Sequence, residues 1–225
     1  LPQTPPPAKG QKASIVDALG LRAMALMKDA NFALFIFLSM LVMIPFTLYF
    51  SLGAKFFDSQ GFKYVTVTMN LGQLVEMGVM LLVPLALKRF GVKWTMVIGL
   101  AALVARYAAF WGGVALDQTA LYFVAVLVHG VIFGFFFVGG QVYVDKKAPA
   151  EIRAQAQGLI VLICFGVGMF LGNLLNVKLI AHYTTDGRCD WNPVFLITSI
   201  CSATLLLACL LYTSPSPRDL STSRM

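Results

Sequence analysis

Charged residues are scarce in this 225-residue sequence: Asp, Glu, Lys and Arg together make up 12% of it, while 59% is hydrophobic. A soluble domain carries about 25% charged residues, so the composition excludes a soluble globular protein and predicts an integral membrane protein. The net charge of +7 would otherwise suggest nucleic-acid binding. The Lys and Arg residues instead lie in short segments between apolar runs, where they set membrane topology, so we expect no nucleic-acid partner.

Enzyme motifs are also missing from the sequence. It contains no phosphate-binding loop, no His–Cys cluster and no Ser–His–Asp set that water would reach. An intramembrane enzyme would need two converging catalytic groups, such as paired aspartates in facing spans, and no predicted span contains an aspartate. The cysteines imply neither a disulfide framework nor a metal site, since Cys164 and Cys201 lie in apolar runs and Cys189 stands alone in a loop. We therefore expect no enzyme activity and no cofactor.

Six apolar segments are each long enough to approach or cross the ~30 Å apolar core of a bilayer. They predict an all-α integral membrane protein with six transmembrane helices. Pro45 lies inside the first segment, where it removes one backbone hydrogen bond at mid-depth. The predicted spans are residues 30–54, 64–87, 94–116, 118–144, 154–177 and 191–208.

The composition divides the chain into four parts. Residues 1–13 read as a Pro-rich cytoplasmic linker, and the segment begins at Leu1 as if cut from within a longer protein. Residues 14–29 predict an amphipathic helix on the membrane surface, with a plain extension of the next helix as the alternative. Residues 30–208 form the predicted six-helix bundle.

The remaining part is the C-terminal tail, residues 209–225. Its sequence, CLLYTSPSPRDLSTSRM, is similar to a translated transposon-type sequencing adapter. We interpret this tail as an assembly artefact that is not native and exclude it from fold reasoning. A polar disordered terminus is the alternative.

Positive charges are unequally shared between the two sides that six spans would create. The side of the N-terminus carries ten Lys and Arg residues and the other side four. Positive loops stay in the cytoplasm, which predicts a multi-pass inner-membrane protein of a bacterium with both ends cytoplasmic. The second span, with Glu76, then runs from outside to inside.

Glu76 is the one charged residue between Tyr64 and Leu87, and it lies near the middle of that span. An ionised carboxylate there costs at least about 2.5 kcal/mol, and helix packing does not require one. Asn70 and Gln73 precede it at spacings of three, so the three side chains lie within one third of the helix circumference. We interpret this polar stripe as part of a solute or proton site. The alternative is a neutral Glu76 that hydrogen-bonds a neighbouring helix as a packing device.

Two other ionisable residues lie inside predicted spans. Arg106 is at a depth similar to that of Glu76, which permits a salt bridge, while snorkelling or pairing with backbone carbonyls are alternatives. His129 fits either a hydrogen bond between helices or a proton relay. Near it, Gly130 and Gly134 are four residues apart, a spacing that allows close approach or sliding of helix backbones.

Several segments together resemble one family of transporters. The turn KRFGVK at 88–93 is similar to the turn that major facilitator transporters place between the second and third helix of each half, without its usual Asp. The segment YVDKKAPAEIRAQAQGLI at 143–160 resembles the fourth-to-fifth-helix loop in the C-terminal half of the nucleoside:proton symporter family. The resemblance extends to LPQTPPPAK, FIFLSML, DWNPVFLI and the Gln73-x-x-Glu76 pair.

This resemblance implies that the chain is the C-terminal six-helix half of a twelve-helix major facilitator fold, with a missing N-terminal half as its partner. It implies that Gln73 and Glu76 line the nucleoside site and that Phe133 packs on the base. The family's polar pair in the first helix of this half is replaced by Thr47 and Phe50. The acidic residue that follows the aromatic is replaced by glycine.

The resemblance and the polar stripe together predict a secondary active transporter, with proton-coupled nucleoside symport as the leading function. The substrate-binding candidates are Gln73, Glu76, Phe133, Asn70, Thr47 and Phe50, and the proton-coupling candidate is Glu76. The expected partners are a small-molecule solute, protons and the lipid bilayer. Two alternatives remain: a major facilitator carrier of another neutral polar solute such as a sugar, and a self-contained six-helix channel or carrier.

Overall fold

The computed structural model describes residues 21–212 and consists of helices apart from one short hairpin. The predicted linker at 1–13, residues 14–20 of the predicted interfacial helix and residues 213–225 of the predicted tail lie outside the described residues. Residues 209–212 of that tail continue the last helix. In order, the elements are η1 (Leu21–Lys28), α2 (Ala30–Ser59), α3 (Val65–Ala115), α4 (Thr119–Leu127), α5 (His129–Val131), η2 (Ile132–Val138), α6 (Gly139–Lys147), η3 (Ala150–Ile152), α7 (Arg153–Val161), η4 (Leu162–Gly168), α8 (Met169–His182), β1 (Thr184–Thr185), β2 (Arg188–Cys189) and α9 (Trp191–Tyr212).

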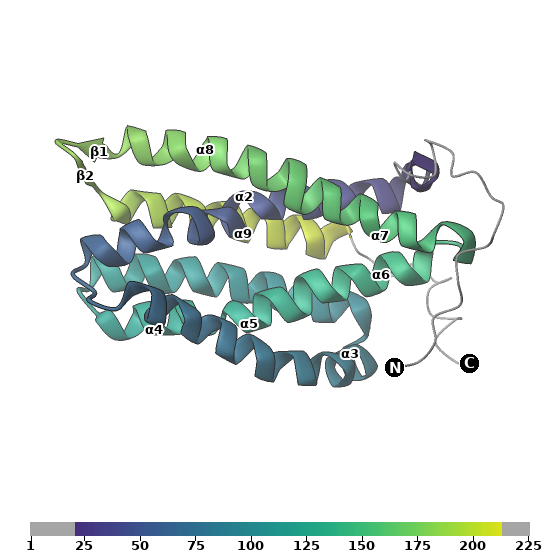
Figure 1. Ribbon diagram of the computed structural model, residues 1–225, viewed down its shortest axis with the longest axis horizontal. Coiled ribbons are helices and arrows are strands. Elements are labelled where there is room, and N and C mark those ends of the chain that lie inside the picture. The colour runs from purple at the N-terminus through teal and green to yellow at the C-terminus, as the bar shows by residue number, and fades with distance from the viewer. Residues whose placement is uncertain (1–20, 213–225) are drawn as a thin grey trace, which may run out of the picture.

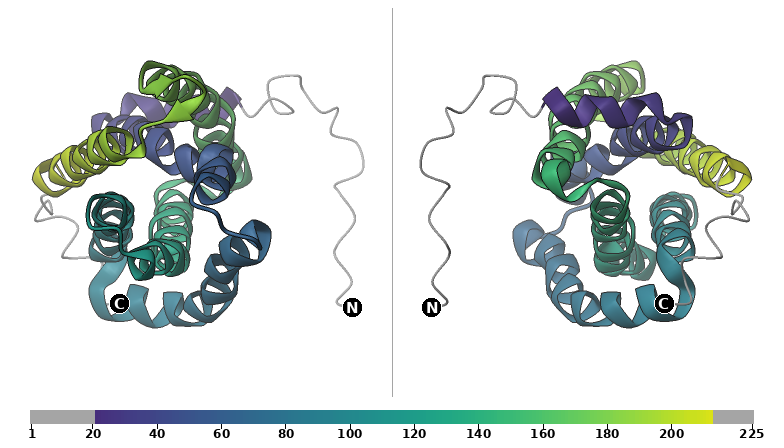
Figure 2. Two further views of the ribbon diagram at one scale, coloured as in Figure 1. Left: turned by 90° about the vertical axis from the view of Figure 1, so that its left-hand side faces the viewer. Right: turned by 90° about the vertical axis from the view of Figure 1, so that its right-hand side faces the viewer.

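Five continuous helical stretches in the described residues are long and apolar enough to cross a membrane. The helix α3 covers the second and third predicted spans in one element of 51 residues. Inside it, Gly91 has φ 74° and ψ 173°, which is not helical. A residue with a Cβ is strained at such a positive φ, so glycine allows the sharp change of direction that Figures 1 and 2 show between the two segments of α3.

The long helices lie roughly side by side along the longest axis of the molecule (Figure 1). The β1–β2 hairpin closes one end, and the start of α2, the bend of α3 and the α6–α7 connection lie at the other. The helix that begins at Thr119 continues through α4, α5, η2 and α6, and the one that begins at Ala150 continues through η3, α7, η4 and α8. Each contains one π-helical stretch, η2 and η4 respectively.

Local capping explains where two of the helices begin. Asp29 is the N-cap of α2, and its carboxylate accepts hydrogen bonds from the N–H groups of Asn31 (2.9 Å) and Phe32 (3.3 Å). The hairpin turn consists of Asp186 and Gly187, both at positive φ, as a two-residue turn of this kind requires. Directly after it, the carboxylate of Asp190 accepts a hydrogen bond from the N–H of Asn192 in the first turn of α9.

An ion pair joins the beginning of α2 to the end of α6. The Lys147 ammonium lies 2.7 Å from the Asp29 carboxylate, and both side chains are partly exposed. The hydrogen bond from Lys147, followed by that from the N–H of Phe32, holds the pKa of Asp29 below its ordinary value. This pair therefore ties together two helices at the end of the bundle opposite the hairpin.

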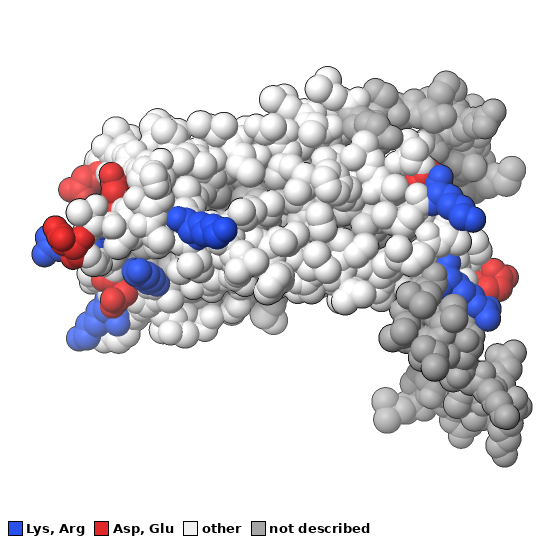
Figure 3. Space-filling model, turned by 90° about the horizontal axis from the view of Figure 1, so that it is seen from above, with Lys and Arg blue, Asp and Glu red and all other residues white. Residues whose placement is uncertain are grey.

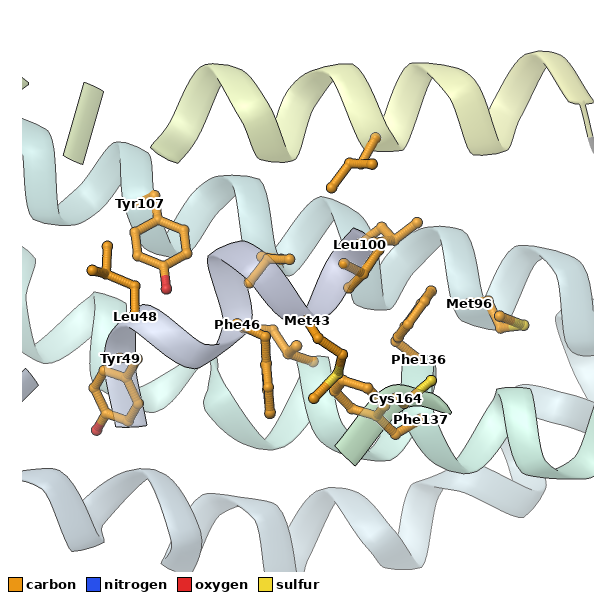
Figure 4. Close-up of a cluster of buried hydrophobic side chains, with 14 of the residues drawn as sticks. Met43, Phe46, Leu48, Tyr49, Met96, Leu100, Tyr107, Phe136, Phe137 and Cys164 are labelled. Atoms are coloured by element: carbon orange, nitrogen blue, oxygen red, sulfur yellow. The ribbon is translucent and has the colours of Figure 1, made fainter. Parts of the chain in front are cut away.

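The buried core is apolar and rich in aromatic rings. Figure 4 shows Met43, Phe46, Leu100, Phe136 and Phe137 side by side between the helices. The outside of the bundle is apolar too, and the charged side chains gather toward its two ends (Figure 3). Exposed apolar side chains cover the surface between those ends, as in Leu81, which is 82% exposed. A soluble monomer rarely exposes so much apolar surface, so this surface is suited to lipid.

Candidate functional site

Neighbouring helices contact α2 near Pro45, in the same part of the helix as the candidates Thr47 and Phe50. Proline lacks an N–H group and so weakens the local helical hydrogen-bond pattern. The carbonyl of Ile44 accepts a hydrogen bond from Asn176 Nδ2 in α8 (2.9 Å), and the Tyr107 hydroxyl in α3 donates to the carbonyl of Pro45. Two neighbouring helices thus hold α2 at the depth of the site.

Glycines bring the backbone of Glu76 against α5. A Cβ atom added at Gly130 would lie 2.6 Å from both the Cα and the backbone N of Glu76. One added at Gly72 would lie 2.8 Å from the carbonyl oxygen of Val126 and 3.0 Å from the Cβ of His129. Any side chain at these two positions would push the helices apart. The absence of side chains at Gly72 and Gly130 is therefore what places Glu76 next to His129.

Three ionisable side chains form a chain across this contact. One oxygen of the half-buried Glu76 carboxylate, Oε2, lies 3.5 Å from His129 Nε2. On the other side of the ring, His129 Nδ1 lies 2.7 Å from Arg106 Nη2. Arg106 also donates from Nε to the carbonyl of Ala125 (3.2 Å) and is fully buried. Direct pairing of Arg106 with Glu76 does not occur, because the His129 ring lies between them.

Aromatic rings surround the imidazole of His129. Its centroid lies 6.2 Å from Phe46, 5.4 Å from Phe50 and 6.4 Å from Phe133. The Tyr49 ring lies 5.7 Å from it and also stacks under the Arg106 guanidinium, 4.4 Å from the ring centroid. Such a cation–π contact stabilises a buried guanidinium. The aromatic shell fixes the orientation of the histidine ring.

The predicted candidates fall into two groups in the structure. Glu76, Phe50 and Phe133 meet around His129. Asn70 and Gln73 are exposed on α3, and neither has a hydrogen-bond partner among residues 21–212. Their side chains are free to meet a solute or another protein surface.

Thr47 lies in a third environment. It is fully buried, and its Oγ1 has no hydrogen-bond partner among the described residues. A Cβ added at Gly172 in α8 would lie 3.1 Å from that oxygen. The structure therefore places Thr47 in the tight contact between α2 and α8, whereas Phe50, one turn further along α2, is 41% exposed.

Sequence reasoning missed a polar contact between α2 and α8. The Ser51 hydroxyl donates to Asn173 Oδ1, and both residues lie one position beyond a residue already discussed, Phe50 and Gly172. A small polar residue after an exposed aromatic carries no signal of its own, so only the packing of the two helices reveals this pair.

Among residues 21–212, no group of three or more His, Cys, Asp and Glu side chains is placed to hold a metal ion.

Comparison with known proteins gives consistent matches. The family model described as "Nucleoside H+ symporter" matches residues 1–217. The chain is 42% identical over 174 residues to the putative nucleoside transporter YegT of Escherichia coli K12, which covers 76% of this chain and 41% of that protein. It is 31% identical over 208 residues to the xanthosine permease of the same organism, covering 88% of this chain and 50% of the permease.

The fold also matches a solved structure. The crystal structure of the nucleoside transporter NupG superposes with a TM-score of 0.81 at 31% sequence identity, covering 93% of this chain and 55% of the NupG chain. The structure of a NupG mutant superposes with a TM-score of 0.84. This chain thus spans about half the length of the relatives it matches.

Proposed function

Because the chain belongs to the nucleoside H+ symporter family, whose model matches residues 1–217, we propose that it is the C-terminal half of a proton-coupled nucleoside transporter. In this proposal α3 contributes two transmembrane helices, one on each side of Gly91, so that the chain has six spans of a twelve-helix major facilitator fold. The non-helical Gly91 and the match to 55% of the NupG chain support this division. The other six helices would come from an N-terminal half.

The observation that carries the proposal is the position of Glu76. Its carboxylate is half-buried, contacts His129 and lies on the same third of α3 as the exposed amides of Asn70 and Gln73. A carboxyl group at this depth is functional by default in membrane proteins. We assign proton binding to Glu76, solute hydrogen bonding to Gln73 and Asn70, and ring packing to the exposed Phe50 and the partly buried Phe133.

Coupling follows from the chemistry of the carboxyl group. A protonated Glu76 has an O–H donor that an ionised one lacks, and a bound solute offers it an acceptor. Proton and solute then each favour binding of the other, which is the reciprocal linkage that a symporter needs. Facilitators of this type hold their substrate between the two halves near the midplane, so the exposed side chains of Asn70, Gln73 and Phe50 would face the other half.

Substrate class is tested by competition in the full-length transporter. Unlabelled nucleosides should reduce uptake of a labelled nucleoside into proteoliposomes, and sugars at the same concentration should not. Competition by sugars alone would favour a carrier of another neutral polar solute, in keeping with Thr47 and Phe50 at the positions of the polar pair. The isolated 225-residue chain is the matched control, because uptake by it would favour a self-contained six-helix channel or carrier.

Orientation in the inner membrane is the second part of the proposal. The excess of Lys and Arg on the N-terminal side supports a cytoplasmic location for the end that carries the Asp29–Lys147 pair. In a variant whose native Cys189 is replaced by Ser, a membrane-impermeant thiol reagent added outside intact cells should label a cysteine placed at Asp58 or Arg188, but not one placed at Lys88. The reverse pattern would refute this topology.

A further inference from the structure

Arg106 and His129 are ionisable residues at membrane depth for which the proposed transport function assigns no role. Arg106 is 0% exposed and His129 is 2% exposed. A buried guanidinium in a membrane protein is expensive unless it is paired, and here one of its nitrogens, Nη1, has no partner among residues 21–212. Packing alone would be served as well by an apolar side chain. The contacts that Arg106 does make therefore indicate a functional role for it.

The hydrogen-bond donors and acceptors of Arg106 and His129 determine the tautomer of His129. An arginine side chain has only N–H donors, so the 2.7 Å contact from Arg106 Nη2 requires Nδ1 of His129 to be the acceptor. In a neutral imidazole the proton must then be on Nε2. That nitrogen is the one 3.5 Å from Glu76 Oε2. The donors thus lie in one direction: Arg106 donates to His129, and the protonated Nε2 of His129 faces the Glu76 carboxylate.

We infer that Arg106 and His129 are positioning residues for the Glu76 carboxylate: Arg106 holds His129 in the Nε2–H tautomer, and His129 holds the ionised carboxylate. This inference rests on the proposed transport function of Glu76. A hydrogen bond to an ionised carboxylate is roughly twice as strong as one between neutral groups. Protonation of Glu76 therefore weakens its hold by His129 and leaves the carboxyl group free to turn to the solute.

The groups around the ring support a fixed tautomer. The ionisable groups that face the imidazole are Glu76 and Arg106 from α3 and Tyr49 from α2. Its other ring neighbours are the phenylalanines Phe46, Phe50 and Phe133. The polar contacts of the imidazole are thus the Arg106 donor on one side and the Glu76 carboxylate on the other.

The tautomer can be measured directly on the 225-residue chain, because the sequence contains only two histidines. In ¹⁵N-histidine-labelled protein in nanodiscs, His129 should show an unprotonated Nδ1 and a protonated Nε2. A His182→Asn variant assigns the signals. Arg106→Met should convert His129 to a mixture of tautomers. A wild-type His129 with its proton on Nδ1 would overturn the inference, whether or not Arg106→Met folds.

Two substitutions of His129 in the full-length transporter separate positioning from packing. His129→Gln keeps an amide N–H for Glu76 and a carbonyl for Arg106, whereas His129→Phe keeps the aromatic packing and loses both polar contacts. Positioning predicts that the proton concentration for half-maximal proton-driven uptake is about tenfold lower in His129→Phe than in His129→Gln, because the ionised carboxylate loses its contact with His129. Packing predicts no such difference between the two variants, and that result would overturn the inference. If Glu76→Gln leaves proton-driven accumulation unchanged, Glu76 is not the proton site, and the tautomer measurement still tests the positioning of His129 by Arg106.

Discussion

Replacing Glu76 with Gln in the full-length transporter should abolish uphill accumulation driven by a pH gradient, while solute counterflow continues. Glutamine has nearly the shape of a protonated glutamate and keeps an N–H donor in place of its O–H, but it cannot release a proton. For one proton per solute, a gradient of one pH unit supports about tenfold accumulation, and this ratio should fall to about one. The measurement is labelled nucleoside in proteoliposomes with an imposed pH gradient, followed by exchange at equal pH.

The matched control for this prediction is Glu151→Gln. It makes the same substitution at an exposed carboxylate in η3, outside the candidate site, and leaves Glu76 unchanged, so accumulation should remain proton-driven. If Glu76→Gln concentrates the nucleoside as well as wild type, the proton site must lie in the N-terminal half. Glu76 would then be a solute-binding or packing residue, as the alternative interpretation of the sequence holds.

Gly130→Ala should destabilise the folded chain by about 1–3 kcal/mol, the usual cost of overpacking. The new methyl group would lie 2.6 Å from the backbone of Glu76, and backbone atoms cannot move aside without displacing a whole helix. Gly78→Ala is the control, because a Cβ there meets nothing within 4 Å and the substitution removes a helix-weakening glycine from α3. It should leave stability unchanged or raise it by about 0.5–1 kcal/mol.

Thermal unfolding of the three proteins in detergent micelles, followed by circular dichroism, measures this difference. The Gly130→Ala protein should also lose the His129–Glu76 contact, since that contact depends on the close approach of the two backbones. Equal unfolding temperatures for Gly130→Ala and Gly78→Ala would show that α3 and α5 are not in the tight contact described.

The helices could be predicted from the sequence because a helix that crosses a bilayer needs a long apolar run, and charged residues lie at the ends of that run. The first predicted span and α2 both begin at Ala30, and the last span and α9 both begin at Trp191. Four of the observed helices end three to five residues past the predicted spans because a helix in a bundle continues into the interfacial region. The resemblance to the nucleoside:proton symporter family is likewise confirmed by the family match.

The partner of Glu76 was beyond reach of the sequence. Spacing along one helix relates Asn70, Gln73 and Glu76, but the neighbour across the interface depends on how closely two helices approach. Here that approach is set by Gly72 and Gly130. A pattern of small residues in the sequence does not indicate which helix they will contact. His129 and Arg106 were therefore recognised singly, while their contact with each other emerges only from the fold.

The π-helical stretches have a consequence for the comparison of relatives. A π turn contains an additional residue compared with the α-helix it interrupts, and each residue of an α-helix turns the chain by about 100°. Beyond η2, the side chains of α6 are therefore rotated relative to the register set by His129 and Phe133. A homologue with a regular helix there would align with a single-residue gap within Ile132–Val138. An alignment that placed this gap in the α6–α7 connection would pair every residue of α6 with the wrong face of the helix.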